Sequence, residues 1–314
     1  MEHKHEKYKQ LISRCQALTA VTTAVAHPCD ESSLRGAVEA AEMGLLVPIL
    51  VGPRARIMAI AAQCALDISP YELLDTPHSQ ASAELAVQLA REGKAEMLMK
   101  GSLHTDELMT AVVSSSNGLR TASRVSHAFI MDVPSLDRVL IITDAAINIF
   151  PTLKDKVDIV QNAINLAHAL GFPEPKVAIL SAMETVNPDV PSTVEAAALC
   201  KMAERKQITG GILDGPLALD NAINLKAAQI KKIDSAVAGM ADILVVPNLE
   251  AGNMLAKSLS FLADADAAGI VLGAKVPIIL TSRADSIMTR LASCAVAALI
   301  VAKKNADASQ ALSL

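Results

Sequence analysis

The sequence is poor in aromatic side chains: its 314 residues include no Trp, two Tyr and four Phe. Proteins that bind single-stranded nucleic acid commonly stack bases on aromatic rings, and this chain has few rings to offer. The formal net charge is −5, and no long run of like charge occurs. Both features argue against nucleic acid as the main partner.

Cysteines are few and scattered, and none forms a CxxC pair. They are Cys15, Cys29, Cys64, Cys200 and Cys294. An odd number at wide spacing favours reduced thiols in a cytoplasm over a disulfide framework or a zinc site. The polar start MEHKHEKYKQ has no apolar signal core, and the uncharged run 291–302 is too short to span a bilayer. We therefore expect a cytoplasmic globular protein without membrane contact.

Several short catalytic signatures are also missing. The sequence contains no GxxxxGK[ST], no HExxH, no GxSxG and no GxGxxG after a predicted strand. These absences argue against a P-loop nucleoside triphosphatase, a zinc protease, a serine hydrolase and an ordinary dinucleotide enzyme. Ser181 lies in the segment SAME and not in a nucleophile elbow, so a covalent hydrolase is not expected.

The chain is long enough for two domains, and 52% of its residues are hydrophobic, which supports large buried sheets. Short apolar runs alternate with amphipathic stretches, a pattern typical of βαβ units in a doubly wound sheet. The turn-rich segment 114–119 (SSSNGL) is the strongest candidate for a domain crossing. Strands are predicted at 19–26, 45–52, 95–99, 126–132, 138–143, 176–180, 211–214, 241–247 and 276–280, and helices at 31–43, 80–93, 106–114, 154–170 and 248–265.

The segment around residue 280 carries a candidate site. The apolar run 276–280 predicts a buried parallel strand that leads into Ser282, Arg283 and Asp285 before a helix. Open α/β sheets bind ligands beyond the carboxyl ends of their strands, so this hydroxyl, guanidinium and carboxylate predict an anion site. A second interpretation stays open: Ser282 or Asp285 caps the following helix.

A second basic group follows another predicted strand. Lys100 and Gly101 precede a helix, so a cation and free backbone N–H groups would meet at one helix N-terminus, an arrangement that suits phosphate. Arg120 and Arg124 follow near the predicted domain crossing, and a guanidinium can hold phosphate through two parallel hydrogen bonds. The alternative is an ordinary solvated loop.

Other predicted strand ends carry polar loops with Asp144, Asn148 and Asn253. Loop composition alone explains any one of them, whereas together they suggest one rim of a sheet. His127 lies in an alternating strand, where a buried core histidine is the alternative to a catalytic base.

Several long segments resemble the phosphate acetyltransferase and phosphate butyryltransferase family, in collinear order over nearly the whole chain. They are GLRTASRVSHAFIMDVP (118–134), DRVLIITDAAINIFPTLKDKVDIVQNA (137–163), ILDGPLALDNAI (212–223), ADILVVPNLEAGNMLAKSL (241–259) and VPIILTSRADS (276–286). The first three are more similar to the butyryl-transferring branch.

This resemblance implies a reversible reaction in which acyl-CoA and phosphate give acyl phosphate and CoA. Coenzyme A is a substrate, and neither a cofactor nor a metal is implied. The implied fold is α/β, with two domains of three-layer α-β-α type around a cleft, like isocitrate and isopropylmalate dehydrogenases. Residues 1–120 plus 275–314 would form the first domain, with 121–274 inserted as the second. The usual assembly of the family is a homodimer.

The resemblance also implies site residues. Ser282 and Arg283 match a Ser-Arg pair that serves the reaction in the acetyl branch, but the aspartate seven residues after the serine is replaced here by Thr289. Asp285 is therefore assigned as the base, and Met109 stands where that branch has an arginine. The residues assigned to phosphate and CoA binding are Lys100, Gly101, Arg120, Arg124, Asp144, Asn148 and Asn253.

These departures leave two alternative functions open. One is a non-catalytic module that binds CoA esters or phosphate on the same fold. The other is a metal- and NAD-dependent decarboxylating dehydrogenase, which shares the general fold type.

Overall fold

The computed structural model describes residues 5–281 and 285–311, and the chain forms two compact units. The discontinuous unit comprises His5–Ser123 and the residues from Ala268 onward, and the continuous unit comprises Arg124–Ala267. The boundaries expected from the sequence follow residues 120 and 274, whereas the units change over after Ser123 and Ala267. That each unit is a domain able to fold separately stays a prediction.

The discontinuous unit has a mixed sheet with the strand order β3-β2-β1-β4-β11-β10. Neighbours from β3 to β11 are parallel, and β10 is antiparallel to β11. The strands are β1 (Val21–Ala26), β2 (Leu46–Gly52), β3 (Glu72–Asp75), β4 (Met97–Lys100), β10 (Asp266–Leu272) and β11 (Ile278–Ile279). Ala26 is paired with Lys100, and Ile279 with Met99, so β1, β4 and β11 end at one edge of the sheet.

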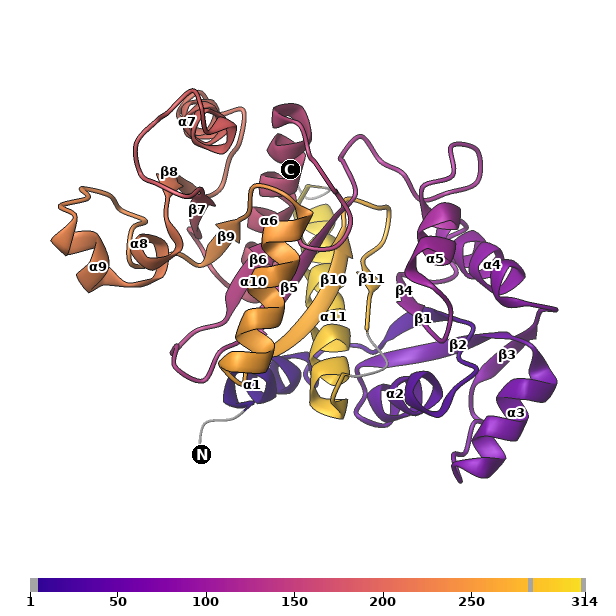
Figure 1. Ribbon diagram of the computed structural model, residues 1–314. Helices are drawn as coiled ribbons and strands as arrows, with labels where there is room; N and C mark the ends of the chain where they lie inside the picture. Colours follow the sequence, from indigo (N-terminus) through magenta and orange to yellow (C-terminus); the bar gives the residue numbers. More distant parts are fainter. Residues whose placement is uncertain (1–4, 282–284, 312–314) are drawn as a thin grey trace. The chain divides into compact units, whose positions relative to one another are not determined.

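Helices cover both faces of these strands. They are α1 (Glu6–Cys15), α2 (Glu31–Glu42), α3 (Arg54–Gln63), α4 (Ser79–Arg91), α5 (Thr105–Val112) and α11 (Ile287–Ala311). Figure 1 shows α4 and α5 on one side of β1–β4 and α2 on the other. Because the strands are covered on both faces, Met97, Leu98 and Met99 form a continuous buried run without alternation.

The N-terminal helix α1 is bonded to strand β10 and to helix α11. The hydroxyl of Tyr8 accepts a 2.7 Å hydrogen bond from the N–H of Ala268, and the Cys15 thiol donates to the carbonyl of Ala295. The middle of α11, from Leu291 to Leu299, is buried on all sides, which explains why its sequence has no polar face. No helix among the described residues is long and apolar enough to cross a membrane.

The strands of the continuous unit lie in the order β5-β6-β9-β7-β8. β5 is antiparallel to β6, and the other neighbours are parallel. The strands are β5 (Ser126–Asp132), β6 (Leu140–Thr143), β7 (Lys176–Leu180), β8 (Ile212–Leu217) and β9 (Ile243–Val245), and the helices are α6 (Leu153–Leu170), α7 (Pro191–Glu204), α8 (Leu219–Ile223), α9 (Leu225–Ile230) and α10 (Leu249–Leu262). Ile142, Leu244 and Leu180 pack with Leu255 and Ala228 in its apolar core.

The local signals that define α6 lie at its two ends. The Thr152 side chain accepts from the N–H of Asp155, and the Asp155 carboxylate accepts from Thr152, which completes a capping box. At the other end Gly171 adopts φ 95°, the left-handed conformation that glycine reaches without strain. The helix predicted at 154–170 is therefore confirmed to within one residue.

The α/β class is confirmed, but details of the sheets differ from the expectation. The sheets are not purely parallel, since β5 and β10 run antiparallel to neighbours. The strand predicted at 276–280 is reduced to Ile278–Ile279. Strand β10 was not expected, because the alanines and aspartates between 263 and 268 prolong the helical pattern of α10, which ends at Leu262 before Asp264 turns the chain with φ 51°.

Candidate functional site

The loops after β1 and β4 are joined by backbone and hydroxyl hydrogen bonds. Gly101 N–H donates to the carbonyl of Ala26 at 2.9 Å, and Ser102 N–H donates to that of His27 at 2.9 Å. The Ser102 hydroxyl donates to the same His27 carbonyl and accepts from Cys29 N–H at 3.1 Å. These bonds fix the segment that begins at Lys100 against the segment that begins at Ala26.

Gly101 makes this close approach possible. A Cβ at this position would lie 2.4 Å from the carbonyl oxygen of Ala26 and 2.5 Å from that of His27. Both atoms belong to the backbone and cannot rotate away, so a larger residue would push the loops apart. Lys100 is half-buried, and its Nζ donates to the carbonyl of Gly101 at 3.2 Å.

The turn before α11 lies at the same edge of the sheet. Ser282 and Arg283 fall outside the described residues, and Asp285 is half-buried. Because β11 runs parallel to β4 and pairs beside it, the segment carrying Asp285 leaves the sheet next to the segment carrying Lys100. The Ser286 hydroxyl accepts from Thr289 N–H at 3.1 Å and so caps α11. Capping therefore does not account for Asp285.

Arg290 lies close to the Asp285 turn, and the sequence did not indicate its role there. It lies in the first turns of α11 and is 8% exposed. Its Nη1 donates to the carbonyl of Ser32 at 2.8 Å, and its Nη2 donates to the carbonyl of Asp285. The signal that could have revealed it is a cation at the start of an otherwise apolar helix.

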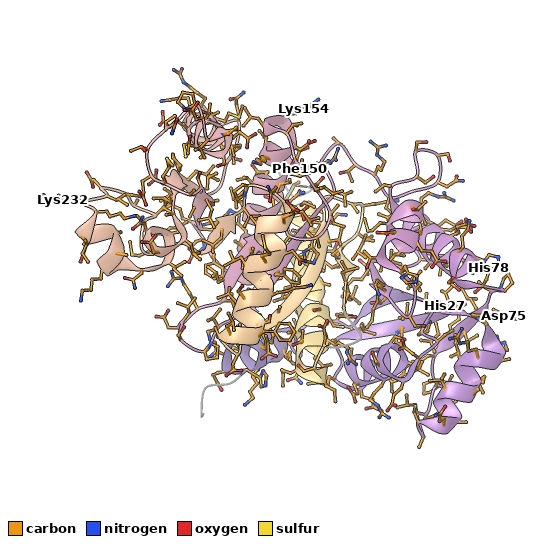
Figure 2. All side chains as sticks on the ribbon, viewed as in Figure 1. His27, Asp75, His78, Phe150, Lys154 and Lys232 are labelled. Carbon is orange, nitrogen blue, oxygen red and sulfur yellow. The ribbon has the colours of Figure 1, made fainter. Side chains whose placement is uncertain are left out.

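His27 leaves β1 with φ 58° and has a buried imidazole. Its Nδ1 lies 3.1 Å from the hydroxyl of Ser82, which is itself hydrogen-bonded to Thr76. Burial lowers the pKa of His27, the Arg56 charge lowers it further, and Glu107 and Asp30 oppose the shift. Figure 2 labels His27 on the side of this unit where Asp75 and His78 follow β3.

Arg120 lies elsewhere in the discontinuous unit. It is exposed and forms an antiparallel bridge with Ala274, ahead of β11. The neighbouring Lys275 donates to the carbonyl of Arg91, the residue that ends α4 before β4 begins. The structure therefore places Arg120 where β4 and β11 begin, and Lys100 and Asp285 where they end.

In the continuous unit, Asp144 organises the loop after β6. Its carboxylate is buried and accepts hydrogen bonds from the N–H groups of His127, Ala146, Ile147 and Asn148. The Asn148 amide adds a fifth bond at 2.6 Å. With these donors around it, the carboxylate serves the loop and offers little to a ligand.

Arg124 and Asn148 form a second pair beside this loop. The Arg124 Nε donates to the Asn148 side-chain oxygen at 2.8 Å, while Asn148 Nδ2 donates to the carbonyl of Val125. The Arg124 side chain is half-exposed and also lies 3.5 Å from the carboxylate of Asp155. Its guanidinium is thus oriented at the edge where β6 ends and β5 begins.

Asn253 joins α10 to the same loop. Its Nδ2 donates to the carbonyl of Ala145 over 3.5 Å. The preceding Gly252 permits this contact, because a Cβ there would lie 3.0 Å from the Cα of Ala145. Asp144, Asn148, Arg124 and Asn253 are therefore brought together within the continuous unit.

His127 behaves as a core residue. Burial lowers its pKa to about 4, against an opposing effect of Asp144, so the imidazole is neutral at neutral pH. The ring packs edge-on against Phe129 with centroids 4.4 Å apart. A base of such low pKa would accept a proton poorly at neutral pH, which favours the core interpretation.

Sequence and structure comparisons identify relatives of this arrangement. The family described as phosphate acetyl/butaryl transferase matches residues 79–298. A phosphate acetyltransferase of Rhizobium meliloti is 65% identical over 96% of this chain and 95% of its own length. A phosphate butyryltransferase of Clostridium acetobutylicum is 40% identical over 95% of this chain and 99% of its own.

The chain belongs to this acyltransferase family.

A solved structure of a branched-chain phosphotransacylase from Enterococcus faecalis V583 is similar in fold to this family member, with a TM-score of 0.79. It is 31% identical, and the match covers 90% of this chain and 99% of that one. The relatives are named for acetyl or for butyryl transfer, so their names do not decide which acyl chain this protein takes.

Four of the five thiols of this family member are poorly suited to nucleophilic attack. Burial raises the pKa of Cys15 and Cys29 to about 11, and that of Cys200 and Cys294 to about 12. These thiols are protonated at neutral pH, whereas the thiolate is the nucleophile. In the described part of the chain, no three His, Cys, Asp or Glu side chains gather where they could hold a metal ion.

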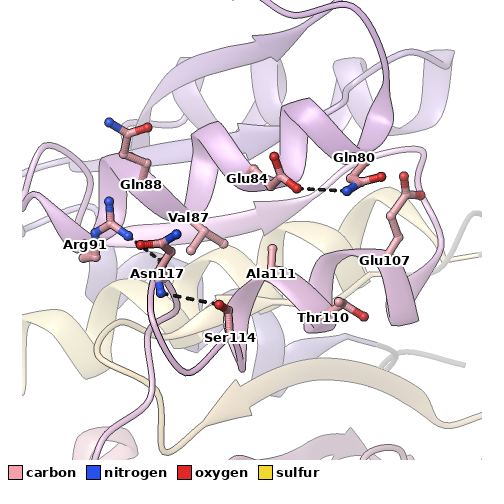
Figure 3. A pocket seen from close by; sticks show the side chains of 10 residues that line it. All are labelled: Gln80, Glu84, Val87, Gln88, Arg91, Glu107, Thr110, Ala111, Ser114 and Asn117. Carbon is pink, nitrogen blue, oxygen red and sulfur yellow. Dashed lines mark hydrogen bonds between the residues drawn. The ribbon is translucent and has the colours of Figure 1, made fainter.

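A surface groove of about 640 Å³ lies between α4 and α5 (Figure 3). Glu84 and Glu107 line it with Gln80 and Gln88, and the predicted site residues that the structure describes do not. Arg91 is the one basic residue among the described residues of this lining, against the two carboxylates, so the groove is a weaker match for the anionic substrates implied for the family. The ends of β1, β4 and β11 remain the better candidate in this unit.

Proposed function

We propose that this protein catalyses the reversible exchange of a short acyl group between coenzyme A and orthophosphate. Family membership over nearly the full length of the relatives supports this reaction. The observation that carries the proposal is the pairing of β11 beside β4, because the segment with Ser282, Arg283 and Asp285 and the segment with Lys100 then follow neighbouring strands at one edge.

The proposed chemistry is attack of the CoA thiolate on the carbonyl of an acyl phosphate, or its reverse. A free thiol has a pKa of about 8.5 and is mostly protonated at neutral pH, so a base is needed. Asp285 is the proposed base, and Arg283 stabilises the charge of thiolate or phosphate. Ser282 donates to the oxyanion or to the leaving sulfur, a contribution of roughly 3 to 4 kcal/mol for a donor of this kind.

The remaining predicted residues have proposed roles in binding. Lys100 and Gly101 precede the N-terminus of α5, where a phosphate would meet a cation and free N–H groups. In the continuous unit the half-exposed Arg124 is the proposed phosphate ligand, and Asn148 orients it.

Asp144 and Asn253 have an indirect proposed role in binding, through the shape of the loop after β6. Asp144 and Asn253 shape that loop, as their hydrogen bonds suggest. Arg120 lies near the opposite ends of β4 and β11, and we do not assign it to the same phosphate as Lys100.

The family resemblance supports the finer structural proposals as well. These are a fold of the isocitrate and isopropylmalate dehydrogenase type, a homodimeric assembly and a cytoplasmic location. Coenzyme A enters as a substrate, and the arginines neutralise the phosphate without a metal.

The decisive experiment is an assay of CoA release from acyl-CoA at increasing phosphate concentration, with acyl groups from acetyl to octanoyl. We expect release to depend strictly on phosphate and to be fastest with a short chain. One or two methylenes change selectivity by about 1 to 3 kcal/mol each, so a clear optimum should emerge. Binding of CoA esters without release would indicate a binding module, and reduction of NAD would indicate a dehydrogenase.

A further inference from the structure

Arg290 links two segments that meet at the edge of the discontinuous unit. Its guanidinium donates to the carbonyl of Ser32, at the start of α2, and to the carbonyl of Asp285, in the turn before α11. Ser32 and Arg290 are separated by 258 positions in the chain. The side chain therefore works as a clamp between distant parts of the sequence.

Burying a guanidinium costs free energy, because the charged group loses its hydration, and packing alone would not require a charged group. Arg290 remains charged at any physiological pH, and the described residues give it no carboxylate partner. Its Nε is also buried without a hydrogen-bond acceptor among them. Replacing buried charges by apolar residues of similar volume is often neutral or stabilising. Two directed bonds to carbonyl groups of distant segments fit a role in positioning those segments better than a role in packing alone.

Helix α2 is adapted to the passage of this side chain. A Cβ on Gly36 would lie 3.1 Å from the Cδ of Arg290, which is closer than ordinary van der Waals contact. Glycine inside a helix costs about 1 kcal/mol relative to alanine. The glycine gives the stem of Arg290 the room it needs to reach Ser32 and Asp285.

The segment that Arg290 clamps is also the one that holds the loop after β4. Gly101 and Ser102 donate to the carbonyls of Ala26 and His27, five or six positions before Ser32. The loop of Lys100 is thus bonded directly to the stretch from Ala26 to Ser32, and the turn of Asp285 is linked to it through the Arg290 side chain. That stretch is the common support of both.

We infer that Arg290 is a positioning residue of the acyl-transfer site, which holds the Asp285 turn in register with the Lys100 loop through the segment 26–32. This inference rests on the proposed function. Arg290 acts through the backbone carbonyls of Ser32 and Asp285. A misplacement of about 1 Å can cost on the order of 100-fold in rate, so a loosened turn should be visible in turnover.

The primary test compares Arg290→Met and Arg290→Lys with the wild type. Met keeps an unbranched apolar stem without donors, and Lys can satisfy only one carbonyl well. We expect kcat for phosphate-dependent CoA release to fall about 100-fold for Met and less for Lys. Calorimetric titration with CoA should give an unchanged stoichiometry, which shows that the chains are folded. The matched control is Arg35→Met, which removes a partly exposed arginine of α2 that pairs with Glu31 and donates to the carbonyl of Cys64, and it should retain wild-type kcat.

Chemical rescue separates positioning from a general packing defect. Arg290→Ala leaves space for a free guanidinium ion, so guanidinium chloride at millimolar concentration should restore kcat at least tenfold, and sodium chloride should not. If Arg290→Ala does not fold, Arg290→Lys tests the inference instead. A positioning role predicts that its kcat lies between those of the wild type and Arg290→Met, with an unchanged stoichiometry of CoA binding. A Met variant with kcat within threefold of wild type, or a loss of CoA stoichiometry that parallels the loss of kcat, would overturn the inference.

A readout independent of catalysis separates this inference from the proposed function. In Arg290→Met, amide hydrogen exchange should accelerate in the peptides 26–36 and 285–295, and in Arg35→Met the peptide 285–295 should exchange as in wild type. A wild-type protein without phosphate-dependent CoA release refutes the proposed function, and unchanged exchange in Arg290→Met refutes the clamp.

Discussion

At the scale of single residues, the proposed mechanism depends most on the hydroxyl of Ser282. We expect Ser282→Ala to lower kcat by roughly two to three decades, because a donor aimed at developing charge is lost while substrate binding is kept. Steady-state kinetics with phosphate and a short acyl-CoA measure this. Ser116→Ala, on an exposed turn, is the control. A change of less than about threefold would remove Ser282 from the site.

A second residue-scale prediction concerns pH and His127. Its pKa is about 4 in the folded protein, because of burial, against 6.5 for the free group. As pH falls below 6.5 the unfolded chain takes up a proton that the folded chain refuses, so stability is lost between pH 6.5 and 4. Between pH 8 and pH 5 this amounts to about 2 kcal/mol.

Urea unfolding at pH 8 and pH 5 measures that loss. His127→Gln, which cannot take up the proton, should show a smaller fall in the free energy of unfolding between the two values. An equal fall in both proteins would show that other groups carry the acid sensitivity.

The sequence revealed candidate catalytic residues only where they lie close together along the chain. Ser282, Arg283 and Asp285 stand within four positions, so their combination was visible as a motif. The role of Arg290 was not visible in the sequence, because it depends on the carbonyl of Ser32, which comes near Arg290 only in the folded chain. Asp144 was assigned to substrate, whereas its five local donors indicate a role in shaping the loop.

At the scale of elements, the contact between the loops after β1 and β4 gives a prediction for Gly101→Ala. A new Cβ would lie 2.4 Å from a backbone oxygen, so the loops must separate. We expect a loss of about 1 to 3 kcal/mol in the free energy of unfolding, typical of overpacking, together with lower turnover. Denaturant unfolding, with Ser116→Ala as control, measures the change. A loss below about 0.5 kcal/mol would mean that the contact is not tight.

Elements with strong periodicity and clear end signals were predictable. Strands 126–132 and 176–180 match β5 and β7, and Gly171 ends α6 as expected. Strand direction was not predictable, because it depends on the partner and not on the strand itself. Strand length also depends on the partner: β11 pairs with β4 over two residues, so it is shorter than the apolar run 276–280.

At the scale of the whole molecule, we predict a sequential mechanism, in which both substrates are bound before the acyl group is transferred. No cysteine lies in a nucleophile motif, and burial raises the pKa of Cys15, Cys29, Cys200 and Cys294. The acyl group should therefore pass directly between thiol and phosphate, without an acylated protein.

Length and composition predicted two α/β parts, but the separation of Arg120 from Lys100 required the structure.

The most direct test follows radiolabelled orthophosphate into acyl phosphate. The protein is mixed with unlabelled acetyl or butyryl phosphate and labelled phosphate, with and without coenzyme A. Direct, reversible acyl transfer predicts that label enters acyl phosphate only when coenzyme A is present. Label incorporated without coenzyme A would contradict the account by revealing an acylated protein, and no incorporation with coenzyme A would contradict acyl transfer itself.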